Sequence, residues 1–389
     1  MNARCEPNML GAYGPWAAAL AGEGPGSLSL RRGGWSDLET WRATARARVW
    51  ECMAPPDTGG APVVQVHQSY TYDGLQVDEL SWQLPYGPRT EAILLKPLGT
   101  KGPLPGVLAL HDHSGHKYFG KEKIVDTGAT RHPAVTEPDV SYGGAAWANA
   151  LAKRGYLVLV PDAFGFGSRR VRLDDVPAVI RAGTAGDGDA LAAVEAYNEW
   201  SGQYESILAK SLLCAGTTWA GAWLAEDRRA LDVLCALPEV DPARVGCGGL
   251  SGGGLRTCYL AGLDDRIACA VCVGMMTTWR DCLLNKSYTH TWMIYIPHLA
   301  RELDYPEILG LRAPRPALVL NDIDDELFTL PEMQRADAML AAIYAETGGS
   351  DRYRCSYYPG PHKFDLPMQA EAFDWFDRWL GGAVQPGTA

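Results

Sequence analysis

The order of the predicted strands and helices constrains the fold of this chain more than any other feature of its sequence. Alternating apolar and polar residues predict a hairpin over 63–82 and a third strand over 90–96. From residue 105 onward, short apolar runs alternate with helical segments. Antiparallel strands followed by such alternation predict an α/β protein, with a mostly parallel sheet covered by helices on both faces.

The predicted elements divide the chain into two parts. Residues 1–60 are expected to be an N-terminal helical extension and residues 61–389 the α/β domain. Strands are predicted at 105–110, 156–160, 245–250, 267–273, 316–320 and 353–357, and helices at 35–53, 145–153, 223–237, 253–261, 330–346 and 368–380. Two connections between predicted elements are longer than a simple loop needs to be, and they span residues 163–222 and 275–312. Their length predicts that they form cap segments and walls of a pocket.

Composition excludes several classes of partner. Apolar residues make up 47% of the 389 positions and charged residues 21%, so a sizeable core can form. A net charge of −11 argues against nucleic acid, and no run is long and apolar enough to span a membrane. The first residues do not resemble a signal peptide, and the ten cysteines lack metal-binding spacing. We therefore expect a reduced, cytoplasmic protein.

A Gly-Leu-Ser-Gly-Gly run at 249–253 fits the pattern G-x-S-x-G, in which the serine is Ser251. A predicted strand precedes the run and a predicted helix follows it. At such a turn the serine hydroxyl stands above the end of the sheet, and a Cβ on either flanking glycine would collide with a neighbouring strand or helix. The pattern predicts a nucleophile elbow with Ser251 as the nucleophile.

A catalytic serine of this kind requires an acid and then a histidine later in the chain. A cluster of acidic residues follows the strand at 316–320, and its members are Asp322, Asp324, Asp325 and Glu326. Only one of them can accept the histidine Nδ1 proton, while the others would be turn or cap residues. The spacing favours Asp325 and leaves Asp324 as the alternative.

His362 lies in a loop rich in glycine and proline between the last strand and the last helix, and no other histidine follows the acidic cluster. This position predicts that His362 takes the proton of Ser251 and returns it to the leaving group.

The oxyanion of such a reaction needs two amide donors. Gly252 follows the nucleophile and supplies the first. The loop after the strand at 105–110 supplies the second, from His113 or, as an alternative, Ser114.

The histidines of the same loop raise the question of a metal. His111, Asp112, His113 and His116 could offer ligands, but no second cluster in the sequence completes a coordination sphere. We therefore expect neither a metal nor another cofactor. In the connection 275–312, aromatic and methionine side chains predict an apolar substrate pocket, which we assign to Met275, Trp279 and Trp292.

Five stretches resemble the dienelactone hydrolase and acetyl xylan esterase-like group of α/β-hydrolases. They are residues 110–121, 155–167, 227–232, 238–246 and 314–321. The resemblance extends over about residues 63–382 and implies a serine hydrolase with an eight-stranded sheet. It also implies that the acid is Asp325, the aspartate of an N-x-x-x-D-x-x-F/P stretch.

Two departures from that group narrow the expected function. Dienelactone hydrolases use a cysteine nucleophile, whereas this chain has Ser251. Secreted acetyl xylan esterases carry export signals, and none is visible here. We expect a carboxylesterase-like serine hydrolase, of class EC 3.1.1.-, that acts on a small-molecule ester.

Two other functions use the same scaffold. One is an acyltransferase, lactone-processing or amide-hydrolysing enzyme of secondary metabolism with the same triad. The other is a binding protein on a hydrolase scaffold, which the presence of all three triad residues disfavours. The expected partner is the small-molecule substrate, with neither nucleic acid nor a membrane, and a homo-oligomer is left open.

Overall fold

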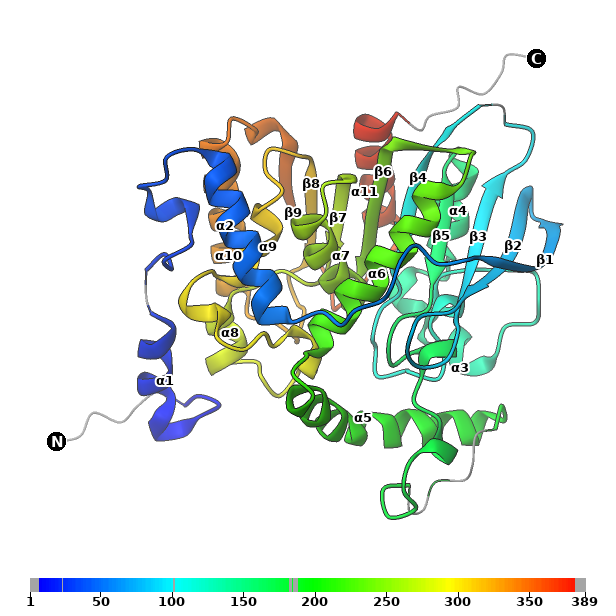
Figure 1. The fold of residues 1–389 in the computed structure, drawn as a ribbon, viewed down its shortest axis with the longest axis horizontal. Helices are drawn as coiled ribbons and strands as arrows, with labels where there is room; N and C mark the ends of the chain where they lie inside the picture. The colour runs from blue at the N-terminus through cyan, green and yellow to red at the C-terminus, as the bar shows by residue number, and fades with distance from the viewer. Residues whose placement is uncertain (1–6, 23, 101, 182–183, 185–187, 382–389) are drawn as a thin grey trace.

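The computed structural model describes residues 7–22, 24–100, 102–181, 184 and 188–381. They form an α/β protein built on one nine-stranded sheet in the order β1-β2-β3-β5-β4-β6-β7-β8-β9 (Figure 1). The strands are β1 Gln65–Tyr72, β2 Leu75–Trp82, β3 Thr90–Pro97, β4 Leu104–Ala109, β5 Leu157–Pro161, β6 Val240–Leu250, β7 Ile267–Val273, β8 Ala317–Asp322 and β9 Tyr353–Tyr358.

The sheet is antiparallel at one end and parallel over the rest. β1, β2 and β3 pair antiparallel, β3 pairs antiparallel with β5, and every pairing from β5 through β4 to β9 is parallel. The predicted fold class is confirmed. The expectation of eight strands was wrong by one, since both strands of the predicted hairpin join the sheet.

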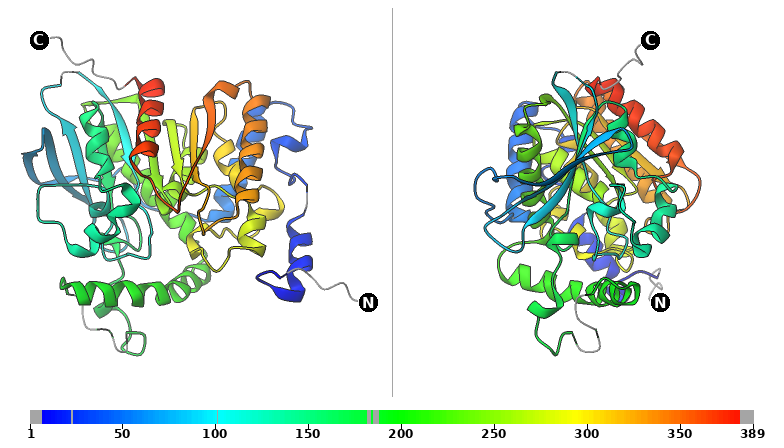
Figure 2. Two further views of the ribbon diagram at one scale, coloured as in Figure 1. Left: turned by 180° about the vertical axis from the view of Figure 1, so that it is seen from behind. Right: turned by 90° about the vertical axis from the view of Figure 1, so that its right-hand side faces the viewer.

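Helices cover both faces of this sheet. The α-helices of the described residues are α1 Gly14–Ala21, α2 Leu38–Met53, α3 Pro133–Thr136, α4 Trp147–Lys153, α5 Leu191–Cys214, α6 Trp219–Ala236, α7 Gly252–Leu263, α8 Trp279–Leu284, α9 Tyr305–Gly310, α10 Leu330–Glu346 and α11 Leu366–Leu380. One face carries α2, α6, α7, α9 and α10, while α4 and α11 lie on the other (Figures 1 and 2).

Successive strand residues enter different hydrophobic clusters because side chains alternate between the two faces of a sheet. Leu157 and Leu159 of β5 pack with the first set of helices, whereas Val158 and Val160 pack with α4 and α11. Burial on both sides explains why the central strands read as continuous apolar runs.

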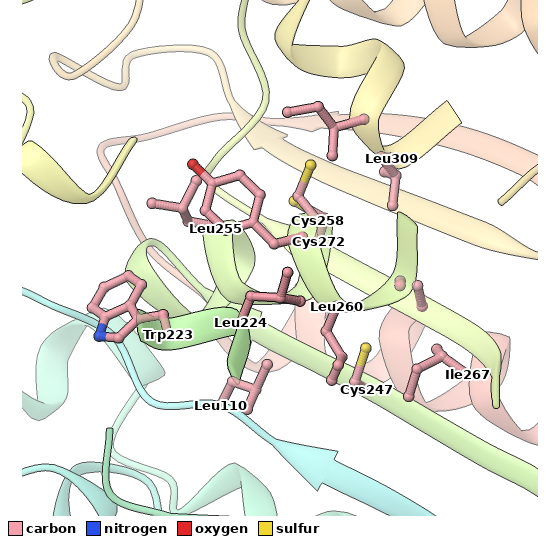
Figure 3. Close-up of a cluster of buried hydrophobic side chains, with 14 of the residues drawn as sticks. Leu110, Trp223, Leu224, Cys247, Leu255, Cys258, Leu260, Ile267, Cys272 and Leu309 are labelled. Atoms are coloured by element: carbon pink, nitrogen blue, oxygen red, sulfur yellow. The ribbon is translucent and has the colours of Figure 1, made fainter. Parts of the chain in front are cut away.

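Cysteines are part of this core. Cys247, Cys258 and Cys272 pack among leucines around α7 (Figure 3). All nine cysteines in the described part of the chain are free thiols. Burial of Cys247, Cys269 and Cys272 agrees with their positions in apolar strands.

The helix α2 belongs to the core although it lies within the N-terminal extension. Asp37 caps it, accepting a hydrogen bond from the Thr40 amide at 2.7 Å. One side of the helix is buried in the cluster shared with α6 and α7, through Trp41, Ala45, Val49 and Met53.

The two long connections hold helices. The connection 163–222 contains α5, a helix of 24 residues that lies across one end of the sheet, apart from the helices on its faces (Figure 1). The connection 275–312 contains α8, α9 and a short 3-10 turn, η7 Trp292–Ile294. No helix of the described residues is long and apolar enough to cross a membrane.

Candidate active site

Ser251 occupies a tight turn between β6 and α7. Its backbone has φ of +56°, in the left-handed region, and its amide donates to the Val273 carbonyl at 2.9 Å. A Cβ at Gly249 would lie 2.1 Å from the Leu110 carbonyl oxygen, and one at Gly253 would lie 2.0 Å from the same atom. Glycine is therefore required at both positions, because Leu110, the residue after β4, lies too close for any side chain.

His362 lies in the loop between β9 and α11, where its ring is oriented by an acid. His362 Nδ1 lies 2.6 Å from Asp325 Oδ2, and Asp325 Oδ1 accepts the Leu327 amide at 2.9 Å. An ionised carboxylate only accepts, so Nδ1 carries the proton and Nε2 presents its lone pair. Nε2 has no hydrogen-bond partner among the described residues, and the ring lines the same cavity as Ser251.

The other acids of the cluster have different partners. Asp324 accepts the Gly360 amide at 3.0 Å, and Glu326 is exposed. Asp322 is buried and accepts the Lys363 amide at 3.0 Å. Burial raises the pKa of the Asp322 carboxyl to about 7. Asp325, which the spacing favoured over Asp324, is the carboxylate that contacts the His362 ring.

The two predicted amide donors are neighbours. A Cβ on Gly252 would lie 2.9 Å from the His113 amide nitrogen, so the main chain of the loop after β4 lies directly against the start of α7. Ser114 also lines the cavity, and its φ of +46° turns the loop immediately after His113.

The side chain of His113 links this loop to the helix α5. Its Nδ1 accepts the Gly115 amide at 2.9 Å, so Nε2 carries the proton and donates to Glu205 Oε1 at 2.6 Å. Lys117 pairs with the same carboxylate oxygen at 2.7 Å. Glu205 and Lys117 were not predicted as part of the site from the sequence.

The histidine loop is held by hydrogen bonds. His111 Nδ1 lies 2.9 Å from the Asp112 carbonyl oxygen, and His116 Nδ1 lies 3.3 Å from the Asn198 amide nitrogen. Both ring nitrogens of His113 are engaged. In the described part of the chain, the three residues close enough to share a metal are Asp322, Asp325 and His362, with ligand atoms within 4.8 Å. That group contains the acid–histidine pair itself.

The cavity at Ser251 has a volume of about 300 Å³. Its walls are mostly apolar and include Met275, one of the three residues that we assigned to a substrate pocket, together with Leu255, Met293 and Ile294. His290 also lines it: burial lowers the pKa of this imidazole to about 4, and its Nε2 lacks a partner among the described residues. His290 is thus a neutral polar group in an apolar cavity.

Trp279 and Trp292 do not line this cavity, in contrast to the prediction. Both line a larger neighbouring cavity of about 540 Å³, between α1, the end of α5 and the segment 279–301. The turn η7 separates the two spaces, since Met293 and Ile294 face Ser251 while Trp292 faces the larger cavity. Trp279 is fixed by its indole N–H, which donates to the Leu303 carbonyl at 3.0 Å.

Similarity to known proteins agrees with this arrangement. No protein-family model matches the chain. It is 30% identical over 295 residues to the "Putative hydrolase YtaP" of Bacillus subtilis (strain 168), covering 75% of this chain and 84% of YtaP. The chain belongs to the YtaP family of hydrolases. The expected resemblance to α/β-hydrolases is confirmed.

Several solved structures share the fold of this chain. A "putative acetyl xylan esterase" from Bacteroides fragilis has a TM-score of 0.67 at 18% identity, covering 90% of this chain and 83% of its own. A glucuronoyl esterase from Solibacter usitatus has a TM-score of 0.62 at 16% identity, covering 93% and 98%. Methylesterase BT1017 has a TM-score of 0.55 at 18% identity, covering 90% and 67%.

Proposed function

We propose that this member of the YtaP family is a serine-dependent carboxylic ester hydrolase that acts on a small-molecule ester. One observation carries the proposal: Ser251 and His362 line one cavity, His362 Nε2 has no hydrogen-bond partner in the described part of the chain, and Asp325 holds the other nitrogen of the ring. The names of the three structural neighbours, all esterases, support an ester as the substrate class.

The acylation step follows from these positions. Ser251 Oγ attacks the ester carbonyl carbon while its proton passes to His362 Nε2. The imidazolium is stabilised by Asp325, and the amides of Gly252 and His113 donate to the carbonyl oxygen as it becomes an oxyanion. Collapse of the tetrahedral intermediate breaks the bond to the alcohol oxygen, which receives the proton from His362.

The deacylation step repeats this chemistry with water. His362 removes a proton from a water molecule whose oxygen attacks the acyl-enzyme carbonyl, and the proton then returns to Ser251 as the acid leaves. The cavity of about 300 Å³ and its methionine, leucine and isoleucine walls suit a short, apolar acyl group.

Hydrolysis of short-chain p-nitrophenyl esters tests the proposal. Ser251→Ala should lower kcat by about 10⁶-fold, since removal of the nucleophile leaves only binding and oxyanion stabilisation. A fluorophosphonate probe should label the wild-type protein and fail to label this variant. Ser211→Ala, at an exposed serine of α5, is the matched control and should behave as wild type. Substantial turnover by folded Ser251→Ala would contradict the mechanism.

A further inference from the structure

We propose that Lys123 is a positioning residue for the oxyanion hole, because its ammonium group fixes the peptide that supplies the His113 amide. The inference rests on the proposed ester hydrolysis and adds a residue that neither the motifs nor the triad geometry requires. Lys123 lies in a short 3-10 turn, Lys121–Lys123, and is 8% exposed.

The contacts of Lys123 are directed at the main chain of the loop after β4. Its Nζ donates to the Asp112 carbonyl at 2.9 Å and to the His113 carbonyl at 3.1 Å. The Asp112 carbonyl also accepts from His111 Nδ1 at 2.9 Å, so both lone pairs of this oxygen are used. The oxygen is therefore held from two sides.

Fixing this oxygen fixes the amide on the other side of the peptide. The Asp112 carbonyl and the His113 N–H belong to the same peptide unit, which is trans, so the two groups point in opposite directions within one plane. Rotation of the unit would break the bonds from Lys123 and His111. The His113 N–H consequently keeps one direction, and its nitrogen lies against the start of α7, where a Cβ on Gly252 would be 2.9 Å from it.

The positive charge adds a second effect. A hydrogen bond from an ammonium group polarises the carbonyl that accepts it, and polarisation of a peptide strengthens its N–H as a donor. Lys123 therefore both fixes the direction of the His113 N–H and strengthens this N–H as a hydrogen-bond donor.

The charge of Lys123 is balanced within the same cluster. Asp112 Oδ2 lies 3.3 Å from Lys123 Nζ, and Asp112 Oδ1 accepts the Tyr142 hydroxyl at 2.5 Å. Burying an ion pair is seldom the most stable solution, since apolar residues of similar volume often do as well or better. The competing interpretation is that Lys123 and Asp112 form a purely structural ion pair. The positioning role and the structural role predict different results when both charges are removed together.

Three variants separate them: Lys123→Met, the double variant Lys123→Met with Asp112→Asn, and Lys121→Met. Lys121 is a matched control, because it is equally buried at 8% but pairs with Asp162 instead of the loop. Each is measured for kcat and KM on p-nitrophenyl acetate, for labelling rate with a fluorophosphonate and for melting temperature.

We expect Lys123→Met to lower kcat by about 10- to 100-fold, somewhat less than loss of a whole oxyanion donor, with KM changed by less than about threefold. The double variant should regain melting temperature, since it removes the unpaired Asp112 charge, but should keep the low kcat. Lys121→Met should lose melting temperature and retain kcat.

Recovery of kcat in the double variant, or wild-type kcat in Lys123→Met, would overturn the inference and leave the proposed function intact. Where Lys123→Met fails to fold, the double variant decides. Absence of both turnover and Ser251 labelling in the wild-type protein would overturn the proposed function, and this inference with it.

Discussion

Asp322, Asp324, Asp325 and Glu326 occupy the end of β8 and the turn that follows, and each has a different environment. Asp325 contacts the His362 ring, Asp324 accepts the Gly360 amide and Asp322 accepts the Lys363 amide. Three of the four carboxylates thus hold the loop between β9 and α11, one through the His362 ring and two through main-chain amides. Only the contact with the ring fixes the tautomer required of a general base.

This division predicts unequal effects of two neighbouring substitutions. Asp325→Asn should lower kcat by about 10⁴-fold, because an amide no longer favours the tautomer with a free Nε2. Asp324→Asn keeps an oxygen that can accept the Gly360 amide and should lower kcat by less than about tenfold. Ester hydrolysis by the two purified variants checks this. Equal losses would mean that the histidine does not depend on Asp325.

Some residues of the site could be predicted from the sequence and others could not. Ser251, Asp325 and His362 follow strand ends in a fixed order, so local pattern and chain order suffice to nominate them. Glu205 lies 92 residues from His113, and Lys123 lies in a turn that no motif marks. Both contact the loop after β4 only once the chain is folded, and periodicity does not encode such contacts.

At the scale of elements, the strands and helices that flank the elbow were predicted nearly in full, whereas α5 was missed. The core elements have long apolar runs or clear amphipathic periods. The buried side of α5 includes Asn198, Ser201 and Glu205, so polar residues interrupt the pattern that would reveal a helix. Asn198 and Glu205 bind the loop after β4, so these polar side chains have partners although they lie on the buried side of the helix.

The glycine in the middle of α5 gives a test of this helix. Gly202 is exposed and a Cβ added there would meet nothing within 4 Å, so Gly202→Ala should stabilise α5 by about 0.5–1 kcal/mol. Slower amide hydrogen exchange in α5 would show it. Gly221→Ala in α6 is the contrasting control. A Cβ at this position would lie 2.1 Å from the Met53 carbonyl oxygen, so this substitution should destabilise the protein. Faster exchange in Gly202→Ala would contradict a helical conformation of α5 at Gly202.

At the scale of the whole molecule, a mostly parallel sheet with helices on both faces followed from the order of elements, but the cavities did not. Alternating strands and helices favour parallel crossovers, so the alternation was enough for the fold class. The turn η7 has only three residues, so neighbouring side chains in it face different cavities. Met293 therefore reaches the cavity at Ser251 while its neighbour Trp292 reaches another, and no sequence period distinguishes the two.

The stability of the whole protein should depend on pH through Asp322. Its pKa rises from 3.8 to about 7 on folding because the carboxyl is buried. Between these values the folded state binds one more proton than the unfolded state, so this group destabilises the protein progressively as pH rises from about 4 to about 7. Asp322→Asn removes the effect, and its melting temperature should exceed that of wild type by more at pH 8 than at pH 4.

Thermal unfolding of both proteins across this range measures the difference. Asp351→Asn, at an exposed aspartate, is the control and should follow the wild-type profile. A gap between Asp322→Asn and wild type that is constant with pH would contradict the buried state of this carboxyl.

The hydrogen bond between Glu205 and His113 joins the helix that spans one end of the sheet to the loop beside Ser251. The two parts therefore share a thermodynamic linkage. If docking of α5 stabilises the ordered loop by some free energy, the ordered loop stabilises the docked α5 by the same amount, because such couplings are reciprocal. By the same reciprocity, a ligand whose binding beside Ser251 orders this loop would also favour the docked position of α5, although α5 does not line that cavity.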